Sequence, residues 1–148
     1  MDKNLVVEHL QYLLDQKIAV LKDSLETLTE ARNNEDKCTV GDKYETGRAM
    51  TQMELEKADL QLRKSEDMKT TLSKVDLKNN PRKVEFGALV ETNSGIYFFC
   101  IPYGKIEVKE NTVFCLSPVS PIGKMLLGKT VGEHVQFQGI EIHIKQIN

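Results

Sequence analysis

The first part of the chain has the spacing of an amphipathic helix. Over residues 4–32, apolar side chains recur at steps of three or four, which places them on one stripe of a helix. The stripe consists of Val7, Leu10, Leu14, Ile18, Leu21, Leu25 and Leu28. Charged side chains occupy the other faces, and neither Pro nor Gly interrupts the run. We predict one long helix that ends at Asn33 and Asn34, because asparagine is a poor residue in a helix interior.

A second, more polar helical segment follows from about residue 40 to residue 74. Its sparse apolar seam consists of Leu55, Ala58, Leu62, Ser65 and Leu72. Thr39 and Asp42 fit a capping box at its start, and the polar run that leads to Pro81 ends it. Two helices joined by a short connection are antiparallel neighbours, and about 30 residues in each correspond to roughly 45 Å. We predict a coiled-coil hairpin over residues 1–77 with its tip at residues 33–42.

The last part of the chain changes to the short, alternating apolar runs of β-strands, separated by turn residues. The runs lie at residues 83–91, 96–102, 105–108, 112–116, 134–138 and 140–147. A short helix is expected over residues 122–127, because Pro121 precedes it and Gly128 follows it. We predict a meander of these strands with one short helix as a second domain over residues 81–148. The fold class is therefore α+β.

Composition supports the division into two modules. All four prolines, seven of the nine glycines and seven of the nine aromatic residues lie in residues 81–148. The net charge is -2, so no strong overall field draws the protein onto nucleic acid or an anionic membrane. No apolar run approaches the ~18 residues of a membrane span, and the first residues lack the apolar core of a signal peptide. We therefore expect a cytoplasmic protein that does not bind membranes.

The predicted tip is acidic. Glu35, Asp36 and Asp42 are three carboxylates within eight residues, and carboxylate oxygens are the ligands that Mg²⁺ prefers. The alternative is a solvated loop in which Asp42 caps the following helix, which is common at acidic turns. The residue pattern leaves both interpretations open.

A phosphate-binding motif occurs in the second module, where Gly123, Gly128, Lys129 and Thr130 match the pattern G-x-x-x-x-G-K-T. A phosphate loop needs a long helix after its Lys-Thr pair, whereas a short alternating strand follows here. We therefore expect no nucleotide binding.

Neither histidine nor cysteine indicates a metal site. His9, His134 and His143 have no carboxylate or cysteine at metal-ligand spacing. Cys38, Cys100 and Cys115 are odd in number and widely spaced, so we expect reduced thiols.

Two motifs of the second module resemble those of the bacterial Gre transcript-cleavage factors. Residues 84–87 (V-E-F-G) match the V-x-F-G that opens the Gre C-terminal domain. Residues 120–133 (S-P-I-G-K-M-L-L-G-K-T-V-G-E) match the Gre pattern S-P-I-x-x-x-L-x-G-K-x-V-G-[DE]. Residues 29–32 (T-E-A-R) resemble the residues before the Gre tip. The order and spacing agree over nearly the whole chain, and in this family G-K-x-V-G is structural.

The resemblance implies an FKBP-like C-terminal domain that docks at the rim of the RNA polymerase secondary channel. The docking segment would include Ser120, Pro121, Ile122, Lys124 and Met125. The hairpin would enter the channel, with indirect contact to the nascent RNA and DNA. The protein itself would be neither an enzyme nor the holder of an intrinsic cofactor.

The resemblance also places the tip carboxylates. In cleavage-competent members, an Asp and a Glu at the tip help to hold the second Mg²⁺ of the polymerase. Asp36 corresponds to that Asp. Val40 stands where the Glu is expected, so one carboxylate is missing unless Glu35 or Asp42 substitutes for it. Val119 likewise replaces an acid that some members use to hold polymerase.

Three functions follow as hypotheses. The first is a monomeric Gre-type regulator that occludes the polymerase channel rather than stimulating cleavage. The second is a coiled-coil adaptor whose protein partner is not polymerase. The third is prolyl isomerisation by an FKBP-like domain; this needs a deep aromatic pocket, and the chain has no tryptophan.

Overall fold

The computed structural model describes residues 1–36 and 41–148, and the side chains of residues 1–34 and 45–148. The chain forms two compact units. We call residues 11–69 the helical unit, and residues 1–10 together with 70–148 the sheet unit. The domain boundary expected after residue 77 stays a prediction.

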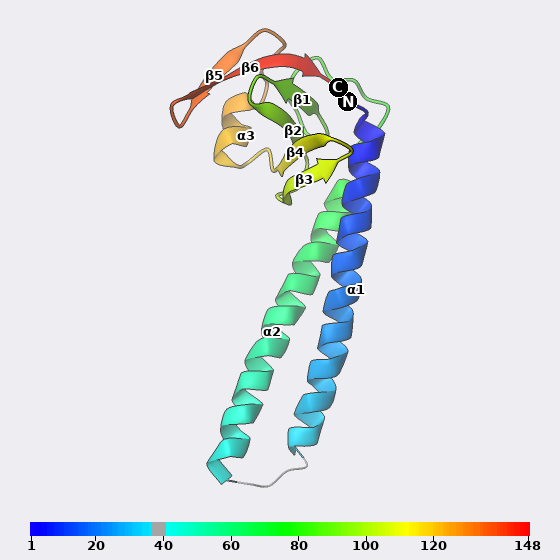
Figure 1. Cartoon of the computed structure of the whole chain (residues 1–148), viewed down its shortest axis with the longest axis vertical. Helices are drawn as coiled ribbons and strands as arrows, with labels where there is room; N and C mark the ends of the chain where they lie inside the picture. The colour runs from blue at the N-terminus through cyan, green and yellow to red at the C-terminus, as the bar shows by residue number, and fades with distance from the viewer. Residues whose placement is uncertain (37–40) are drawn as a thin grey trace. The chain divides into compact units, whose positions relative to one another are not determined.

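The two predicted helices are present. Helix α1 spans Lys3–Asp36 and helix α2 spans Gly41–Leu72 (Figure 1). Asp15 and Lys69 form an ion pair across the helical unit, so the helices are antiparallel neighbours as expected. Leu14, Ile18 and Leu21 are buried along the α1 stripe, as its spacing predicted.

The helix ends differ from the prediction. α1 continues past Asn33 and Asn34 to Asp36. The helix-propensity penalty of asparagine is well below 1 kcal/mol per residue, which is too small to end a helix by itself. α2 ends at Leu72, two residues earlier than expected. Thr39 of the predicted capping box lies outside the described residues.

The sheet unit contains six strands and one short helix, which confirms the α+β class. The elements are β1 (Leu89–Thr92), β2 (Gly95–Phe99), β3 (Gly104–Val108), β4 (Asn111–Leu116), α3 (Pro121–Leu126), β5 (His134–Phe137) and β6 (Ile140–Ile147). Their order in the sheet is β3-β4-β2-β1-β6-β5 (Figure 1). The first strand is shorter than the expected 83–91, because Gly87, at a φ of 85°, turns the chain before it.

The expected meander is wrong in one respect. β2 and β4 are parallel neighbours, with Ile96 opposite Val113 and Phe99 opposite Leu116. The chain leaves the sheet after Phe99, forms β3 at the edge and returns as β4 between β3 and β2. A long-range pairing of this kind depends on which apolar faces pack together, which strand periodicity does not specify.

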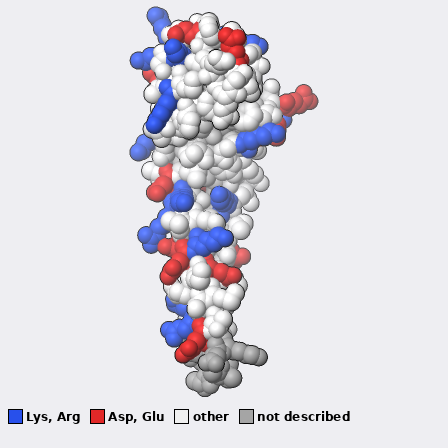
Figure 2. All heavy atoms as spheres, turned by 90° about the vertical axis from the view of Figure 1, so that its left-hand side faces the viewer, with Lys and Arg blue, Asp and Glu red and all other residues white. Residues whose placement is uncertain are grey.

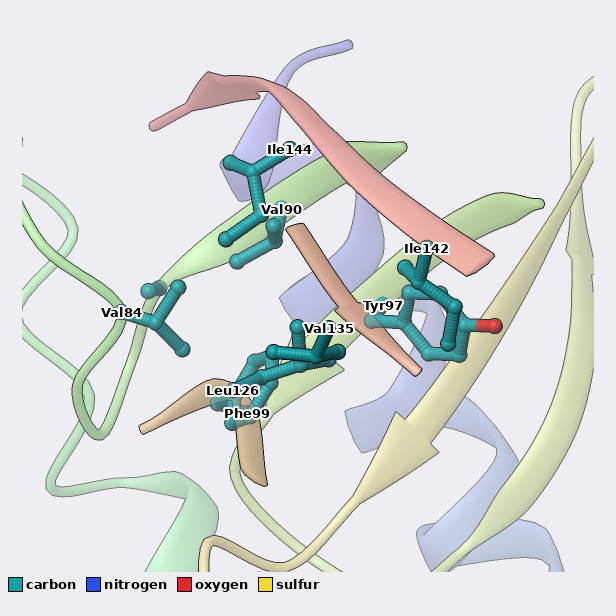
Figure 3. Close-up of a cluster of buried hydrophobic side chains, with 9 residues drawn as sticks. Val84, Val90, Tyr97, Phe99, Leu126, Val135, Ile142 and Ile144 are labelled. Carbon is teal, nitrogen blue, oxygen red and sulfur yellow. The ribbon is translucent and has the colours of Figure 1, made fainter. Parts of the chain in front are cut away.

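The core of the sheet unit lies between one face of the sheet and α3. Its buried side chains come from β1, β2, β5, β6, α3 and the segment before β1, and they converge in Figure 3. They are Val84, Ala88, Val90, Tyr97, Phe99, Leu126, Val135, Ile142 and Ile144. Because Leu126 is fully buried, the short helix has a fixed orientation on the sheet.

Charges of both signs occur along the described part of the hairpin (Figure 2). Basic and acidic side chains are interspersed on the face shown in Figure 2, as expected from the near-neutral composition. Among the described residues, none of the helices combines the length and hydrophobicity that a bilayer span requires.

Candidate functional site

The fold brings the two sequence motifs of the second module together. Val84 donates its backbone N–H to the carbonyl of Lys129 at 2.8 Å, and its own carbonyl accepts from Gly128 at 2.7 Å. Lys83 and Thr130 form an antiparallel bridge beside them. The segments around residues 84 and 128 therefore form one substructure, although more than 40 residues separate them in the sequence.

Helix α3 begins in this substructure, and its start is well determined by its sequence. Ser120 is the N-cap, and its hydroxyl accepts the N–H of Gly123 at 3.1 Å. Pro121 occupies the first turn, where a missing N–H costs nothing. Gly123 is buried so closely that an added Cβ would lie 2.4 Å from the carbonyl oxygen of Ser117. Only glycine fits at that position.

The five residues predicted to bind a partner therefore differ in accessibility. Ser120 and Ile122 are partly buried: the first caps α3 and the second packs against the core. Pro121, Lys124 and Met125 are exposed. A protein partner could touch these last three without unfolding the helix.

Sequence analysis assigned Val119 to this surface, at the position of an acid in some Gre factors, but it did not assign Leu127 and Val131. Val119, Leu127 and Val131 are 73%, 47% and 55% exposed, beside Met125 at 40%. We call residues 119–131 the docking segment. Four apolar side chains of this segment are thus exposed, interspersed with polar and buried residues. On a helix this short, burying Leu126 leaves the neighbouring side chains exposed. The sequence alone does not show that Leu126 is the buried residue; the tertiary structure does.

The nucleotide-binding motif has no free phosphate cradle. Its backbone N–H groups donate to protein acceptors: those of Gly123, Lys124, Leu127, Gly128, Lys129 and Thr130 all have partners within the sheet unit. The Lys129 ammonium lies 3.2 Å from a carboxylate oxygen of Glu133. The hydrogen bond from the Thr130 N–H, aided by the Thr130 hydroxyl and Lys129, lowers the pKa of Glu133. The segment is a structural turn, in agreement with the sequence expectation.

The predicted tip site lies outside what the structure describes. Glu35, Asp36 and Asp42, the expected catalytic and Mg²⁺-binding acids, have no described side chains, and Cys38 and Val40 fall in the gap at residues 37–40. Elsewhere in the described part of the chain, no three His, Cys, Asp or Glu side chains are arranged to hold a metal ion.

Two histidines have a carboxylate partner that the sequence analysis missed. The Nε2 atoms of His134 and His143 lie 3.5 Å and 3.3 Å from the two carboxylate oxygens of Glu141. The two imidazole rings are cross-strand neighbours, with centroids 5.2 Å apart. Pairing about Gly139 alone would set residue 134 opposite residue 144, whereas the observed turn at Gln138 and Gly139 sets it opposite residue 143. The three side chains are about half exposed and form a surface cluster.

The described cysteines are free and buried. Cys100 directly follows the last residue of β2, and Cys115 lies on β4. Burial raises the pKa of the Cys100 thiol. A protonated, buried thiol is a poor nucleophile. These cysteines therefore act as small apolar core residues.

Comparisons with known proteins complete the description. No family model and no curated protein matches the chain. Among solved structures, the transcription factor Gfh1 is similar at 19% sequence identity and a TM-score of 0.35, over 95% of this chain and 92% of that one.

Proposed function

We propose that the chain is a Gre-type transcription regulator that binds RNA polymerase in its secondary channel. One observation carries the proposal. The two stretches that resemble Gre motifs hydrogen-bond to each other through Val84, Gly128 and Lys129. The two motifs therefore occur together because they form one substructure. A long helical hairpin precedes this substructure in the chain, as in the Gre family.

Each unit has a part in this proposal. The sheet unit, which we propose to be FKBP-like, docks through the exposed apolar side chains of residues 119–131. The hairpin supplies reach, since the 34 residues of α1 correspond to roughly 50 Å at 1.5 Å per residue. The chain itself catalyses no reaction in this proposal, and it acts in the cytoplasm, where its partner is.

We propose that the hairpin occludes the channel rather than stimulating transcript cleavage. Cleavage would need tip carboxylates to share the polymerase's Mg²⁺, which activates water for hydrolysis. Val40 replaces one of the two expected acids. Asp36, with Glu35 or Asp42, would have to supply the oxygen ligands.

A backtracked elongation complex distinguishes the two modes. We expect added protein to slow nucleotide addition without shortening the RNA, and we expect Asp36→Ala to behave like the unsubstituted chain. Accelerated RNA shortening that Asp36→Ala abolishes would contradict occlusion while leaving polymerase binding intact.

Met125→Lys tests the docking segment. We expect this substitution to weaken binding to purified core polymerase at least about tenfold, because it places a charge at the centre of an apolar contact. Ile140→Lys is the matched control: Ile140 is 59% exposed in the same unit but lies on β6, outside residues 119–131. Fluorescence anisotropy of the full chain, labelled on its hairpin, measures both affinities. Equal affinities for the two variants would contradict docking through this segment.

A second function is favoured by a separate observation. Met50, Met53 and Leu60 are 61%, 70% and 54% exposed on α2, and exposed methionines are common on adaptable protein-binding surfaces. An adaptor that binds a different protein through the hairpin would show this feature. Absence of any binding to core polymerase would favour the adaptor.

A further inference from the structure

The outer face of the β5–β6 hairpin carries two histidines side by side. His134 on β5 is paired with His143 on β6, and both face solvent, because the adjacent Val135 and Ile142 are buried on the other face. His143 makes its backbone hydrogen bonds with Asn93: its N–H donates to the Asn93 side-chain oxygen, and its carbonyl accepts the Asn93 N–H. His134 and His143 therefore form a non-hydrogen-bonded antiparallel pair. In such a pair the Cα atoms are about 4.5 Å apart and the side chains approach most closely.

The two imidazole rings have the spacing of two ligands of one metal ion. Their centroids lie 5.2 Å apart, and their planes are inclined by 35°. An ion that binds imidazole nitrogens at about 2.0–2.1 Å lies about 3.2 Å from each ring centroid, so tetrahedral coordination separates the two centroids by about 5.2 Å. The strands already hold His134 and His143 at this separation. Binding of an ion therefore requires rotation of two side chains rather than a rearrangement of the backbone.

Glu141 supplies a negative charge beside both rings. Its two carboxylate oxygens lie 3.5 Å from Nε2 of His134 and 3.3 Å from Nε2 of His143. Both separations exceed the about 2.7–2.9 Å of a strong charge-assisted hydrogen bond, so Glu141 does not lock either ring. The side chains of His134, His143 and Glu141 are 60%, 48% and 56% exposed, so an ion can reach them from solvent.

The backbone that carries the pair is held at the turn and beneath the strands. Gln138 and Gly139 connect β5 to β6 with φ values of 49° and 80°. Positive φ at both residues of a two-residue turn fits the twist of the flanking strands. Val135, Ile142 and Ile144 belong to the core cluster on the inner face. The pair is therefore pre-organised, which reduces the entropy lost when a ligand binds.

We propose that His134 and His143 form a surface site for a divalent late transition-metal ion such as Zn²⁺, with water at the remaining coordination positions. Imidazole is a ligand of Zn²⁺, Cu²⁺ and Ni²⁺, whereas Mg²⁺ prefers oxygen ligands. The site needs only two protein ligands, in keeping with the absence of a three-ligand cluster among the described residues. Glu141 attracts the ion and accepts hydrogen bonds from its water. The site lies outside residues 119–131, so it goes beyond the proposed function and holds whichever partner the protein has.

NMR spectroscopy of the full, untagged chain tests the site with ZnCl₂ as the probe. Every sample carries Cys38→Ser, because a thiolate elsewhere in the chain would compete for Zn²⁺. The chain has three histidines, and the third, His9 on α1, is an internal control. We expect Zn²⁺ to shift the imidazole signals of His134 and His143 with one shared midpoint, and to leave those of His9 in place. MgCl₂ should shift none of the three.

Two outcomes of the NMR titration would overturn the proposal. One is a spectrum in which Zn²⁺ shifts only one, or neither, of the His134 and His143 signals. The other is an equal shift of the His9 signals, which would show that Zn²⁺ binds exposed imidazoles without selecting the cross-strand pair.

Calorimetric titration of variants with ZnCl₂ measures what each side chain contributes. We expect His134→Ala and His143→Ala each to weaken Zn²⁺ binding at least about tenfold, and Glu141→Gln to weaken it about tenfold. His9→Ala is the matched control, since it removes an imidazole from another element, and it should leave the affinity within about twofold. Equal affinities of His143→Ala and His9→Ala would overturn the proposal.

Discussion

Phe99→Ala is expected to lower the free energy of unfolding of the sheet unit by about 3–5 kcal/mol. Phe99 has no exposed surface and lies on β2, between β1 and β4, in the main core cluster. Removing its ring leaves a cavity. The neighbouring side chains belong to four strands and α3, so they cannot all move inward to fill it. A loss of that size is a large fraction of the 5–15 kcal/mol by which domains are stable.

Near-UV circular dichroism during urea unfolding measures this loss selectively, because seven of the nine aromatic residues lie in residues 81–148. Phe86→Ala is the control: the same truncation in the same unit, at a ring that is 37% exposed. We expect it to cost less than half as much. Phe86 belongs to the V-x-F-G motif. A small loss of stability in Phe86→Ala would show that the fold does not depend on this ring, which is compatible with a role in binding. Equal losses for the two variants would show that the core is not where the structure places it.

Gly123→Ala is expected to cost about 3 kcal/mol, although it adds a single methyl group. The new Cβ would lie 2.4 Å from the Ser117 carbonyl oxygen, 2.7 Å from the Ser120 hydroxyl and 3.0 Å from the Pro118 carbonyl oxygen. Two of these atoms are backbone, so α3 must move away from its N-cap. The variant should then lose both stability and the fixed position of residues 119–131.

Lys124→Ala is the control for Gly123→Ala, since Lys124 is the next residue of α3 and is exposed. Its effect on the unfolding free energy should stay within about 0.5 kcal/mol. Thermal unfolding followed at the same aromatic signals compares the two variants. A Gly123→Ala protein with unchanged stability would contradict the close packing of α3 around this glycine.

Part of the candidate site could be predicted from the sequence. The Ser-Pro start and the glycine after residue 127 define α3, because capping and turn preferences are local. Which side of α3 faces outward could not be predicted, since a six-residue helix has too few turns to show a stripe. The exposure of Leu127 and Val131 therefore became evident only from the tertiary structure, which buries Leu126 in the core. The tip acids remain a prediction.

Asn93 shows the same division on a smaller scale. Its place in an Asn-Ser-Gly run predicted a turn, and it does lie between β1 and β2. Its side chain also accepts the N–H of His143 at 2.8 Å and donates to the Glu141 carbonyl at 2.9 Å. These bonds join the turn to β6 where the β1–β6 register shifts. No local pattern could have indicated a partner about 50 residues away.

The sequence by itself determined the elements of this protein: two long helices, short strands between turns, and a capped helical turn near residue 121. Periodicity, capping and turn preferences act over a few residues, so they are legible along the chain. Only the tertiary structure decided the parallel pairing of β2 with β4, the meeting of Val84 with Gly128, and the Glu141 cluster. These depend on which apolar faces bury each other, and that free energy belongs to contacts between residues far apart in the sequence.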